Sequence, residues 1–424
     1  MKSVEDTLWD VLVIGGGPAG MMAAGRASER RDAAGRCASV LLIEKNATLG
    51  KKLLITGGGR CNVTNAEFDT RTLLARFNKS DKFLFSAFSQ WAVPETLDFF
   101  HMREMQTKIE AEQRVFPITN KAESVWNVLV DYIKRGNVTV LSKSVVIGLI
   151  KKGNQIEGVV LKNKKMVRAK SVILATGGKS RPETGSTGEG FEWLKSVGHS
   201  VSEPEASLVP IAIKDMWVKK LAGTTLSDVK ITVLQNEVKQ AQKIGKILFT
   251  HVGLSGPTIL NMSKDVGELL KYGEVTISLD LLPPLDYGEM NRKLQDVFKE
   301  HSNKKFKNSL SGLLSSRLAP VIVELSGISS DTPCNSVTRE ERLRLVKLLK
   351  HIPLSVKGLL GVEKAIVTSG GVSLDEVDFK TMSSRLFPNL YLVGDILNID
   401  RPSGGYSLQL CWTTGYVAGN SVRV

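Results

Sequence analysis

The sequence is poor in residues that bind metal ions or form disulfides, with four cysteines and five histidines among 424 residues. The cysteines are Cys37, Cys61, Cys334 and Cys411; they include no CxxC pair, and no two histidines are spaced i, i+4. These spacings disfavour a zinc cluster, a disulfide framework and a helical metal site. We therefore expect reduced thiols and no metal ion.

Long hydrophobic runs are also lacking. The apolar stretches at 11–14 and 172–175 have the length of strands and fall far short of the roughly 20 residues that cross a bilayer. The N-terminus combines Glu5, Asp6 and Asp10 with a short apolar run, unlike a secretory signal. We expect a cytoplasmic protein with no membrane partner, and the sequence leaves its oligomeric state open.

The chain is too long for one hydrophobic core, because such cores stop growing at roughly 250–300 residues. Its 42% hydrophobic and 24% charged residues are typical of a globular protein. The net charge of +14 is unusual, and basic runs stand at 162–170, 304–307 and 339–350. A basic run is usually a solvated surface, but these runs make a polyanion such as RNA a candidate partner.

A glycine-rich motif near the N-terminus indicates a nucleotide site. The apolar run 10–14 leads into Gly15, Gly17 and Gly20, and a stretch of small residues with helical character follows. A second apolar run ends in Glu44, which completes a unit of strand, helix and parallel strand. In such a unit the helix N-terminus binds a pyrophosphate, and the acid accepts a hydrogen bond from a ribose hydroxyl. The pattern predicts an adenine dinucleotide in an α/β lobe.

Three later segments favour FAD over NAD, since an extended FAD needs contacts at its flavin end from distant parts of the chain. The pair Gly394-Asp395 ends a strand and offers a carboxylate to the ribityl chain. The turn 175–178 ends another strand, and the glycine-rich turn 57–62 follows the ribose-binding acid. Because glycine lets the backbone approach a ligand closely, we expect these turns at the flavin.

Further motifs extend over nearly the whole chain. They are VIGGGPAG at 13–20, LGKKLLITGGGRCNVTN at 49–65, RVFP at 114–117, LATGG at 174–178, TGSTGEG at 184–190, GKILFTHVGLSGPTIL at 245–260, TSGGV at 368–372 and GGYSLQ at 404–409. Together they resemble the BaiN/YhiN-type flavoproteins, which are NAD(P)/FAD-dependent oxidoreductases that include aminoacetone-oxidase-family enzymes and ribosomal RNA dihydrouridine synthase. Two positions depart from that pattern, with Asp395 where relatives often have Glu and Ser407 where they have Asn.

The resemblance implies an α/β fold with a Rossmann-like FAD-binding lobe of the two-dinucleotide-binding flavoprotein type, an inserted β-barrel-like domain and a small helical domain. On this pattern the FAD lobe takes 1–198 and 363–424, and the inserted β-rich domain takes 199–280 and 319–362. The helical domain takes 281–318, and helical spacing recurs at 338–350.

The expected cofactor residues belong to the dinucleotide turn, the ribose-binding acid with nearby lysines, and the turns that face the flavin. They are Gly15, Gly17, Pro18, Ala19, Gly20, Glu44, Lys45, Lys51, Gly58, Gly59, Arg60, Cys61, Asn62, Ala175, Thr176, Gly177, Gly394, Asp395, Gly404 and Gly405.

Cys61 and His251 are the candidate catalytic residues. A thiol beside a flavin suits a proton donor or a redox partner, whereas a buried cysteine selected for its size is the plainer alternative. A dithiol would need the distant Cys411. His251 lies in a glycine-rich turn and either transfers a proton or has a structural role. Arg60 either offsets negative charge on the flavin or substrate, or forms a surface ion pair.

The resemblance offers two chemistries: reduction of an activated C=C bond, including uracil to dihydrouridine in ribosomal RNA, and oxidation of small amines. Because basic charge suits RNA better than a cationic amine, we expect an NAD(P)H-driven reductase that forms dihydrouridine in ribosomal RNA. NADPH or NADH would dock transiently, since only one dinucleotide fingerprint is present. A small-molecule flavin oxidase, a reductase of steroid-like enones and a non-catalytic FAD scaffold are the alternatives.

Overall fold

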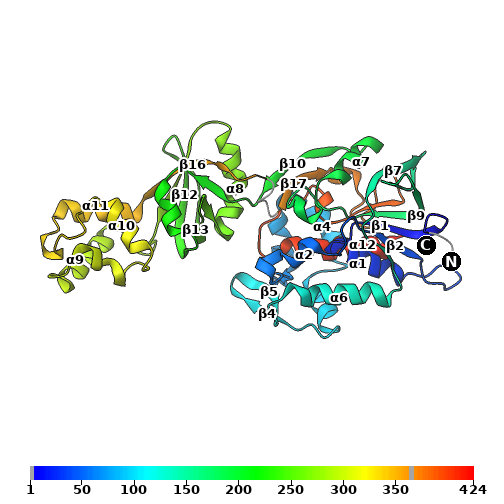
Figure 1. Cartoon of the computed structure of the whole chain (residues 1–424), viewed down its shortest axis with the longest axis horizontal. Helices are drawn as coiled ribbons and strands as arrows, with labels where there is room; N and C mark the ends of the chain where they lie inside the picture. The colour runs from blue at the N-terminus through cyan, green and yellow to red at the C-terminus, as the bar shows by residue number, and fades with distance from the viewer. Residues whose placement is uncertain (1–3, 362–366) are drawn as a thin grey trace. The chain divides into compact units, whose positions relative to one another are not determined.

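The computed structural model describes residues 4–361 and 367–424. Two compact units make up the chain, one formed by Met1–Ser207 with Val362–Val424 and the other by Leu208–Gly361. In Figure 1 both the blue and the red segments lie in the first unit, so both ends of the chain build it. Within the described residues, no helix has the length and apolar character that crossing a membrane requires.

A seven-stranded sheet forms the centre of the first unit, in the order β6-β2-β1-β9-β8-β7 with β18 also paired to β9. Its strands are β1 (Leu8–Ile14), β2 (Val40–Ile43), β6 (Thr139–Leu141), β7 (Val146–Lys152), β8 (Gln155–Leu161), β9 (Met166–Leu174) and β18 (Leu390–Leu392). Strands β6, β2, β1, β9 and β18 run parallel, and β7 and β8 are antiparallel. The predicted parallel sheet, with a C-terminal strand returning to it, is confirmed.

Helices cover this sheet, which explains why its parallel strands are nearly continuous hydrophobic runs. The helices of the first unit are α1 (Pro18–Ser28), α2 (Lys51–Leu54), α3 (Thr70–Leu74), α4 (Asp81–Phe88), α5 (Val93–His101), α6 (Ala122–Arg135), α7 (Glu189–Val197) and α12 (Tyr406–Ser421). Smaller sheets are formed by β3 (Thr64–Asn65), β4 (Thr107–Glu110) and β5 (Arg114–Pro117), and by β10 (Val201–Ser207) and β17 (Val367–Val372).

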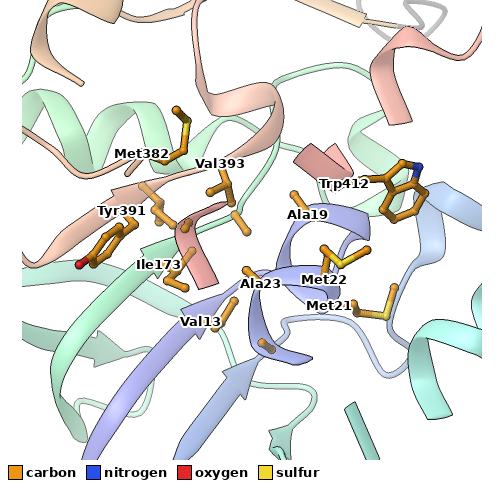
Figure 2. Close-up of a cluster of buried hydrophobic side chains, with 14 of the residues drawn as sticks. Val13, Ala19, Met21, Met22, Ala23, Ile173, Met382, Tyr391, Val393 and Trp412 are labelled. Carbon is orange, nitrogen blue, oxygen red and sulfur yellow. The ribbon is translucent and has the colours of Figure 1, made fainter. Parts of the chain in front are cut away.

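Helices α1 and α12 pack against each other through small residues. A Cβ atom on Gly415 would lie 2.5 Å from the carbonyl oxygen of Ala19, and one on Gly419 would lie 2.5 Å from that of Ala23. Figure 2 shows Ala19 and Ala23 on α1 above Val13 of the sheet, in one buried cluster. This close contact brings the last helix of the chain against the first, so distant sequence motifs meet in one place.

A closed barrel forms the centre of the second unit, in the order β11-β14-β13-β12-β15-β16. Its strands are β11 (Ile211–Ile213), β12 (Thr225–Gln235), β13 (Val238–Phe249), β14 (Gly253–Ser255), β15 (Val275–Asp280) and β16 (Ile352–Leu359). The helices of this unit are α8 (Pro257–Leu270), α9 (Tyr287–Glu300), α10 (Leu318–Ser326) and α11 (Arg339–Lys350). The inserted β-barrel-like domain inferred from the family resemblance is confirmed.

The helical part of the second unit differs from the range 281–318 given above. Helix α11, and all of α10 except its first residue Leu318, lie within the range 319–362 that was assigned to the β-rich domain. Their apolar side chains, among them Ile322 and Leu345, are buried in the same cluster as the barrel residues Ile231 and Ile277. The helices and the barrel strands therefore share one hydrophobic core. The apolar residues of the sequence did not show where a helical domain ends and a β-rich domain begins. The division into three domains stays a prediction.

Candidate functional site

A cavity of about 1190 Å³ of empty space, part of it open to solvent, lies in the first unit. Its walls include Ile14 and Ile43, which end β1 and β2, and Ala175 and Val393, which follow β9 and β18. All four strands are parallel, so the cavity lies at their carboxyl ends. Ligands of open α/β sheets bind at this position, because side chains and helix N-termini converge there.

The predicted dinucleotide turn forms one wall of the cavity. Gly15 has a φ of +104°, and a Cβ on it would lie 2.4 Å from the carbonyl oxygen of Ala175. A Cβ on Gly20 would lie 1.9 Å from the carbonyl oxygen of Gly15, so this glycine serves packing and does not line the cavity. Gly17 does line it, and a Cβ there would meet no atom within 4 Å.

Helix α1 begins beside that open space. Gly17 is its N-cap and provides no side-chain cap, and Pro18 has no N–H group. The first N–H groups of a helix lack partners within the helix and, together with the helix dipole, favour an anion. Open space at Gly17 and an uncapped 11-residue helix therefore fit a pyrophosphate.

Glu44 lies at the end of β2 and lines the same cavity. It is buried, and its carboxylate accepts hydrogen bonds from the Gly16 N–H at 2.8 Å and the Asn46 N–H at 2.7 Å. Oε1 also accepts a hydrogen bond from the Asn46 side-chain amide at 2.8 Å, whereas Oε2 accepts only the one from Gly16 and has a second lone pair for a ribose hydroxyl. The Lys45 ammonium pairs with Glu189 at 2.5 Å, and Lys51 donates to the Glu183 carbonyl oxygen at 2.8 Å.

Another part of the cavity wall is charged. Asp395 lines it, and its carboxylate is paired with the Arg401 guanidinium and lies 3.6 Å from the Lys52 ammonium. Burial alone would raise the pKa of Asp395, but these two cations outweigh it and lower the pKa. The carboxylate is therefore ionised at neutral pH. Cys411 also lines the cavity, and burial together with the charge of Asp395 raises the pKa of its thiol to about 12.

The turn after β9 adds a polar group that has no partner. Ala175, Thr176 and Gly177 all line the cavity, and Gly177 has a φ of +73°. The hydroxyl oxygen of Thr176 is buried and has no hydrogen-bond partner among the described residues. Since a buried polar group without a partner is costly, this hydroxyl fits contact with a bound ligand. Together with Gly17 and the charged group at Asp395, it makes the cavity suitable for FAD.

The glycine-rich turn at 57–62 does not line the cavity, although five of its residues were expected at the cofactor. Those residues are Gly58, Gly59, Arg60, Cys61 and Asn62. Gly58 and Gly59 have φ values of +68° and +85°. Because glycine adopts this left-handed backbone conformation without strain, the conformation alone accounts for glycine at both positions. Their role at a flavin stays a prediction.

Arg60 and Cys61 have well-defined partners. The Arg60 guanidinium pairs with Glu110 at 2.5 Å, donates to Asn120 and lies over the Phe116 ring at 4.1 Å. This is the surface ion pair that was the alternative for Arg60. Cys61 has no exposed surface, and burial raises the pKa of its thiol to about 12. The thiol therefore keeps its proton at neutral pH, and its catalytic role stays a prediction.

The remaining predicted residues lie elsewhere. Gly404 and Gly405 precede α12 and are not cavity residues; a Cβ on Gly405 would lie 2.3 Å from the carbonyl oxygen of Thr64, so this glycine serves close packing. His251 is exposed in the turn between β13 and β14 of the second unit. Its role at the cofactor also stays a prediction.

Several cavity residues were missed by sequence reasoning. Among them are Asn46, Lys52, Ser144, Val146, Trp193 and Leu408, together with Cys411, which was considered only as a thiol partner of Cys61. Lys52 adjoins the predicted Lys51, so the run of two lysines was the available signal. Trp193 stands in the helix that follows the TGSTGEG motif, but nothing in its own pattern separates a cavity residue from a core residue. Both departures from the family pattern, Asp395 and Ser407, line the cavity and contact Arg401.

Fold and site define a Rossmann-like protein with a dinucleotide cavity at the carboxyl ends of its parallel strands. Over residues 9–421 the chain matches the model of the HI0933-like protein Rossmann domain, and it belongs to this HI0933-like family. The family places it among the FAD-dependent oxidoreductases, as the motifs predicted.

Known relatives span its full length. The chain is 30% identical to the 3-dehydro-bile acid delta(4,6)-reductase of Clostridium scindens, over 96% of this chain and 98% of that protein. It is 29% identical to the ribosomal RNA dihydrouridine synthase of Escherichia coli, over 98% of each. Among solved structures, the 3-ketosteroid-delta4-(5alpha)-dehydrogenase of Rhodococcus jostii is 14% identical, with a TM-score of 0.53 over 98% of this chain and 97% of that one, and shares the fold.

Proposed function

We propose that this protein uses NADPH or NADH to reduce a C=C bond conjugated to a carbonyl group, and that its substrate is uridine in ribosomal RNA. The names of the two relatives support the reaction class, because a dihydrouridine synthase and a delta(4,6)-reductase both saturate such a bond. Bound FAD supplies the hydride for this chemistry. The protein must bind FAD, exclude water and deliver a proton to the other carbon.

The cofactor residues in this proposal are those of the first-unit cavity. Gly17 and the N-terminus of α1 would contact the pyrophosphate, and Glu44 would contact the adenosine ribose. Asp395 and the Thr176 hydroxyl would contact the flavin half of the cofactor. Cys61 and His251 are the proposed proton donors, and the protonated state of the Cys61 thiol at neutral pH is compatible with that role.

The observation that favours RNA is a strand of exposed cations in the second unit. Strand β13 has three lysines, Lys239, Lys243 and Lys246, and no acidic residue. All three are exposed, and their ammonium groups have no ion-pair or hydrogen-bond partner among the described residues. Cations without protein partners along an extended strand are suited to successive phosphates. Strand lysines also discourage edge pairing between molecules, a role that would give no RNA affinity.

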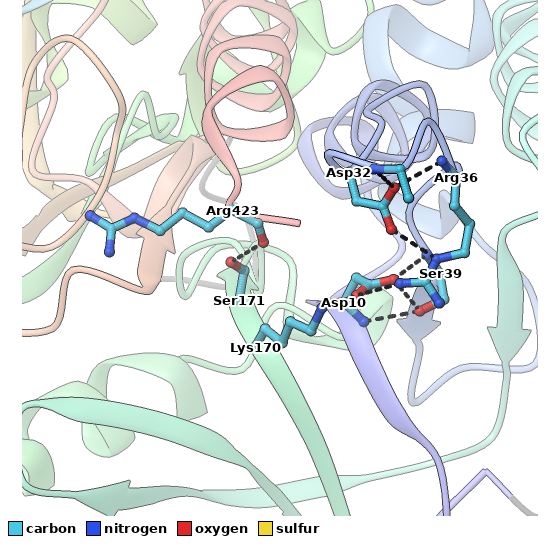
Figure 3. Close-up of polar contacts among 8 residues, drawn as sticks. Asp10, Asp32, Arg36, Ser39, Lys170, Ser171 and Arg423 are labelled. Carbon is cyan, nitrogen blue, oxygen red and sulfur yellow. Dashed lines mark hydrogen bonds and ion pairs between the residues drawn. The ribbon is translucent and has the colours of Figure 1, made fainter.

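Part of the charge in the basic runs expected from the sequence is paired within the protein. In the run 162–170, Lys165 pairs with Glu5 at 2.9 Å, and Lys170 pairs with Asp10 at 2.7 Å, as Figure 3 shows for the second pair. In the run 304–307, two lysines share Asp331. These four cations are already paired within the protein, so they offer less to a polyanion. The exposed cations Lys162, Lys164, Arg168, Arg339, Arg344 and Lys347 in the runs 162–170 and 339–350 have no side-chain partner among the described residues and stay candidates for the same role.

The experiment compares two acceptors with one holoprotein preparation. Anaerobic protein is mixed with NADPH or NADH, and then with a ribosomal RNA fragment or a steroid dienone. We expect flavin reduction by one nucleotide and dihydrouridine in the RNA, detected by mass spectrometry. Dienone reduction with unmodified RNA would replace the proposal with a small-molecule reductase. Failure of both nucleotides to reduce the flavin would refute NAD(P)H as reductant and favour amine oxidation or a scaffold.

A pair of matched variants tests the β13 contact. K239Q/K246Q removes two exposed cations that have no side-chain partner among the described residues, whereas K305Q/K307Q removes two that pair with Asp331. Each lost phosphate contact should lower the slope of log affinity against log salt by about 0.7–0.9. We expect the slope to fall by about two contacts for the β13 variant and by less for the control, while both variants keep the same rate of flavin reduction by the nicotinamide nucleotide. Equal slopes in both variants would refute β13 as an RNA contact.

A further inference from the structure

Arg401 is a buried cation close to the cavity but not part of its wall. Its guanidinium has no exposed surface, although the chain turns at this point between β18 and α12. Three partners fix it: Nη1 donates to the Ile399 carbonyl oxygen at 2.7 Å, Nε donates to the Ser407 hydroxyl at 3.0 Å, and Nη2 pairs with Asp395. A buried guanidinium keeps its charge, because arginine does not lose its proton in proteins.

The charges in this group do not cancel. Asp395 contributes one negative charge, and it faces two positive charges, those of Arg401 and Lys52. Lys52 is partly exposed and also donates to the Ser180 hydroxyl at 2.7 Å, whereas Arg401 is shielded from solvent. Shielded charges are screened least, so the group presents a net positive charge to the cavity.

The other end of the cavity indicates which half of the dinucleotide meets this charge. Glu44 is the acid at the end of β2, the position of the ribose-binding acid of the adenosine half. The pyrophosphate position at α1 then directs the flavin half toward Asp395, which lines the cavity with Ser407 and Cys411. Arg401 touches two of these three residues and so acts on the cavity through them.

We propose that Arg401 is a positioning residue that holds Asp395 as a fixed, ionised carboxylate and leaves a net positive charge at the flavin end of the cavity. This charge favours the reduced flavin, which bears more negative charge than the oxidised form. The inference rests on the assignment of FAD and not on the identity of the substrate, so the readouts below do not depend on the RNA proposal.

The test is the two-electron midpoint potential of bound FAD, measured by equilibration with a reference dye. R401M and K52M each remove a positive charge and should lower the reduced-to-oxidised ratio at fixed potential about tenfold, equal to about 30 mV. D395N removes the negative charge and should raise the potential. R401K keeps the positive charge and should restore most of the wild-type potential.

Opposite signs for the cation and anion variants distinguish this electrostatic role from a structural one. If R401M and D395N shift the potential in the same direction, or if R401M leaves it unchanged, the proposal is wrong. If R401M does not fold, R401Q provides the same loss of charge with an amide donor in place, and its expected sign is the same. FAD absorption spectra of each variant show whether the flavin is bound when its potential is read.

Discussion

Replacement of Gly17 by alanine should weaken FAD binding without unfolding the protein. Gly17 has φ −78° and ψ −176°, which alanine adopts without strain, and a Cβ there would meet no atom within 4 Å. The residue nevertheless lines the cavity where α1 begins. A methyl group would therefore occupy space that the fold leaves open and that the pyrophosphate requires.

The size of the effect follows from the contacts that the methyl group would prevent. Loss of one hydrogen bond to a charged group costs about 1.5–3 kcal/mol. At about 1.4 kcal/mol for each factor of ten, the Kd for FAD should rise by about 10- to 150-fold. The apoprotein itself should gain about 0.4–1 kcal/mol, because alanine restricts the unfolded chain more than glycine does.

Gly20 provides the matched control, since its Cβ would lie 1.9 Å from the carbonyl oxygen of Gly15. G20A should lower the Tm of the apoprotein, whereas G17A should not. The assay combines thermal unfolding of apoprotein with FAD titration followed by flavin fluorescence. Wild-type affinity in G17A would show that the pyrophosphate does not lie at this turn, and a Tm loss equal to that of G20A would show that Gly17 is not open.

Three further predictions concern ionisable groups that are buried or half-buried. Asp10→Asn should cost about 1–3 kcal/mol in urea unfolding at pH 7, because the buried carboxylate pairs with Lys170 (Figure 3), and an unchanged midpoint would contradict this. Burial would raise the pKa of Glu376, but hydrogen bonds from Ser200 lower it below its usual 4.5. The contribution of Glu376 to the free energy of unfolding is therefore present at neutral pH and is lost as the pH falls through the folded-state pKa. Glu376→Gln should therefore destabilise at pH 7 and much less near pH 3; a constant difference would refute this. Cys61 should resist iodoacetamide until the protein unfolds, as peptide mass mapping can check.

The sequence was most informative where function depends on local backbone geometry. Gly15, Gly17 and Gly20 were recognised by their spacing within six residues. The turn at Gly15, the open space for the pyrophosphate at Gly17 and the close packing at Gly20 each require glycine. Glu44 was recognised because the second strand had to end at the same sheet edge. Asp395 followed from the same argument at the last parallel strand. All of these except Gly20 line the cavity.

Contacts between distant residues were beyond sequence reasoning. Lys165 lies in a basic run, yet its partner Glu5 is 160 residues away. Arg60 lies in a turn beside two glycines expected at the flavin, yet it pairs with Glu110 at the end of β4. Arg401 was not singled out at all, because a single arginine in a loop carries no periodic signal. Charge counts along the chain therefore overstated the cations available for a partner.

In the proposed assignment, cofactor binding and RNA contact fall in different units of the chain. Every residue that lines the FAD cavity belongs to the first unit, whereas the cations on β13 and the exposed His251 belong to the second. Relatives that share the fold over their full length are named for an RNA product and for a bile acid. Relatives that share a fold can act on different substrates, since function depends on the site and not on the fold alone. Substitutions on β13 should therefore change RNA affinity and leave FAD affinity as it is.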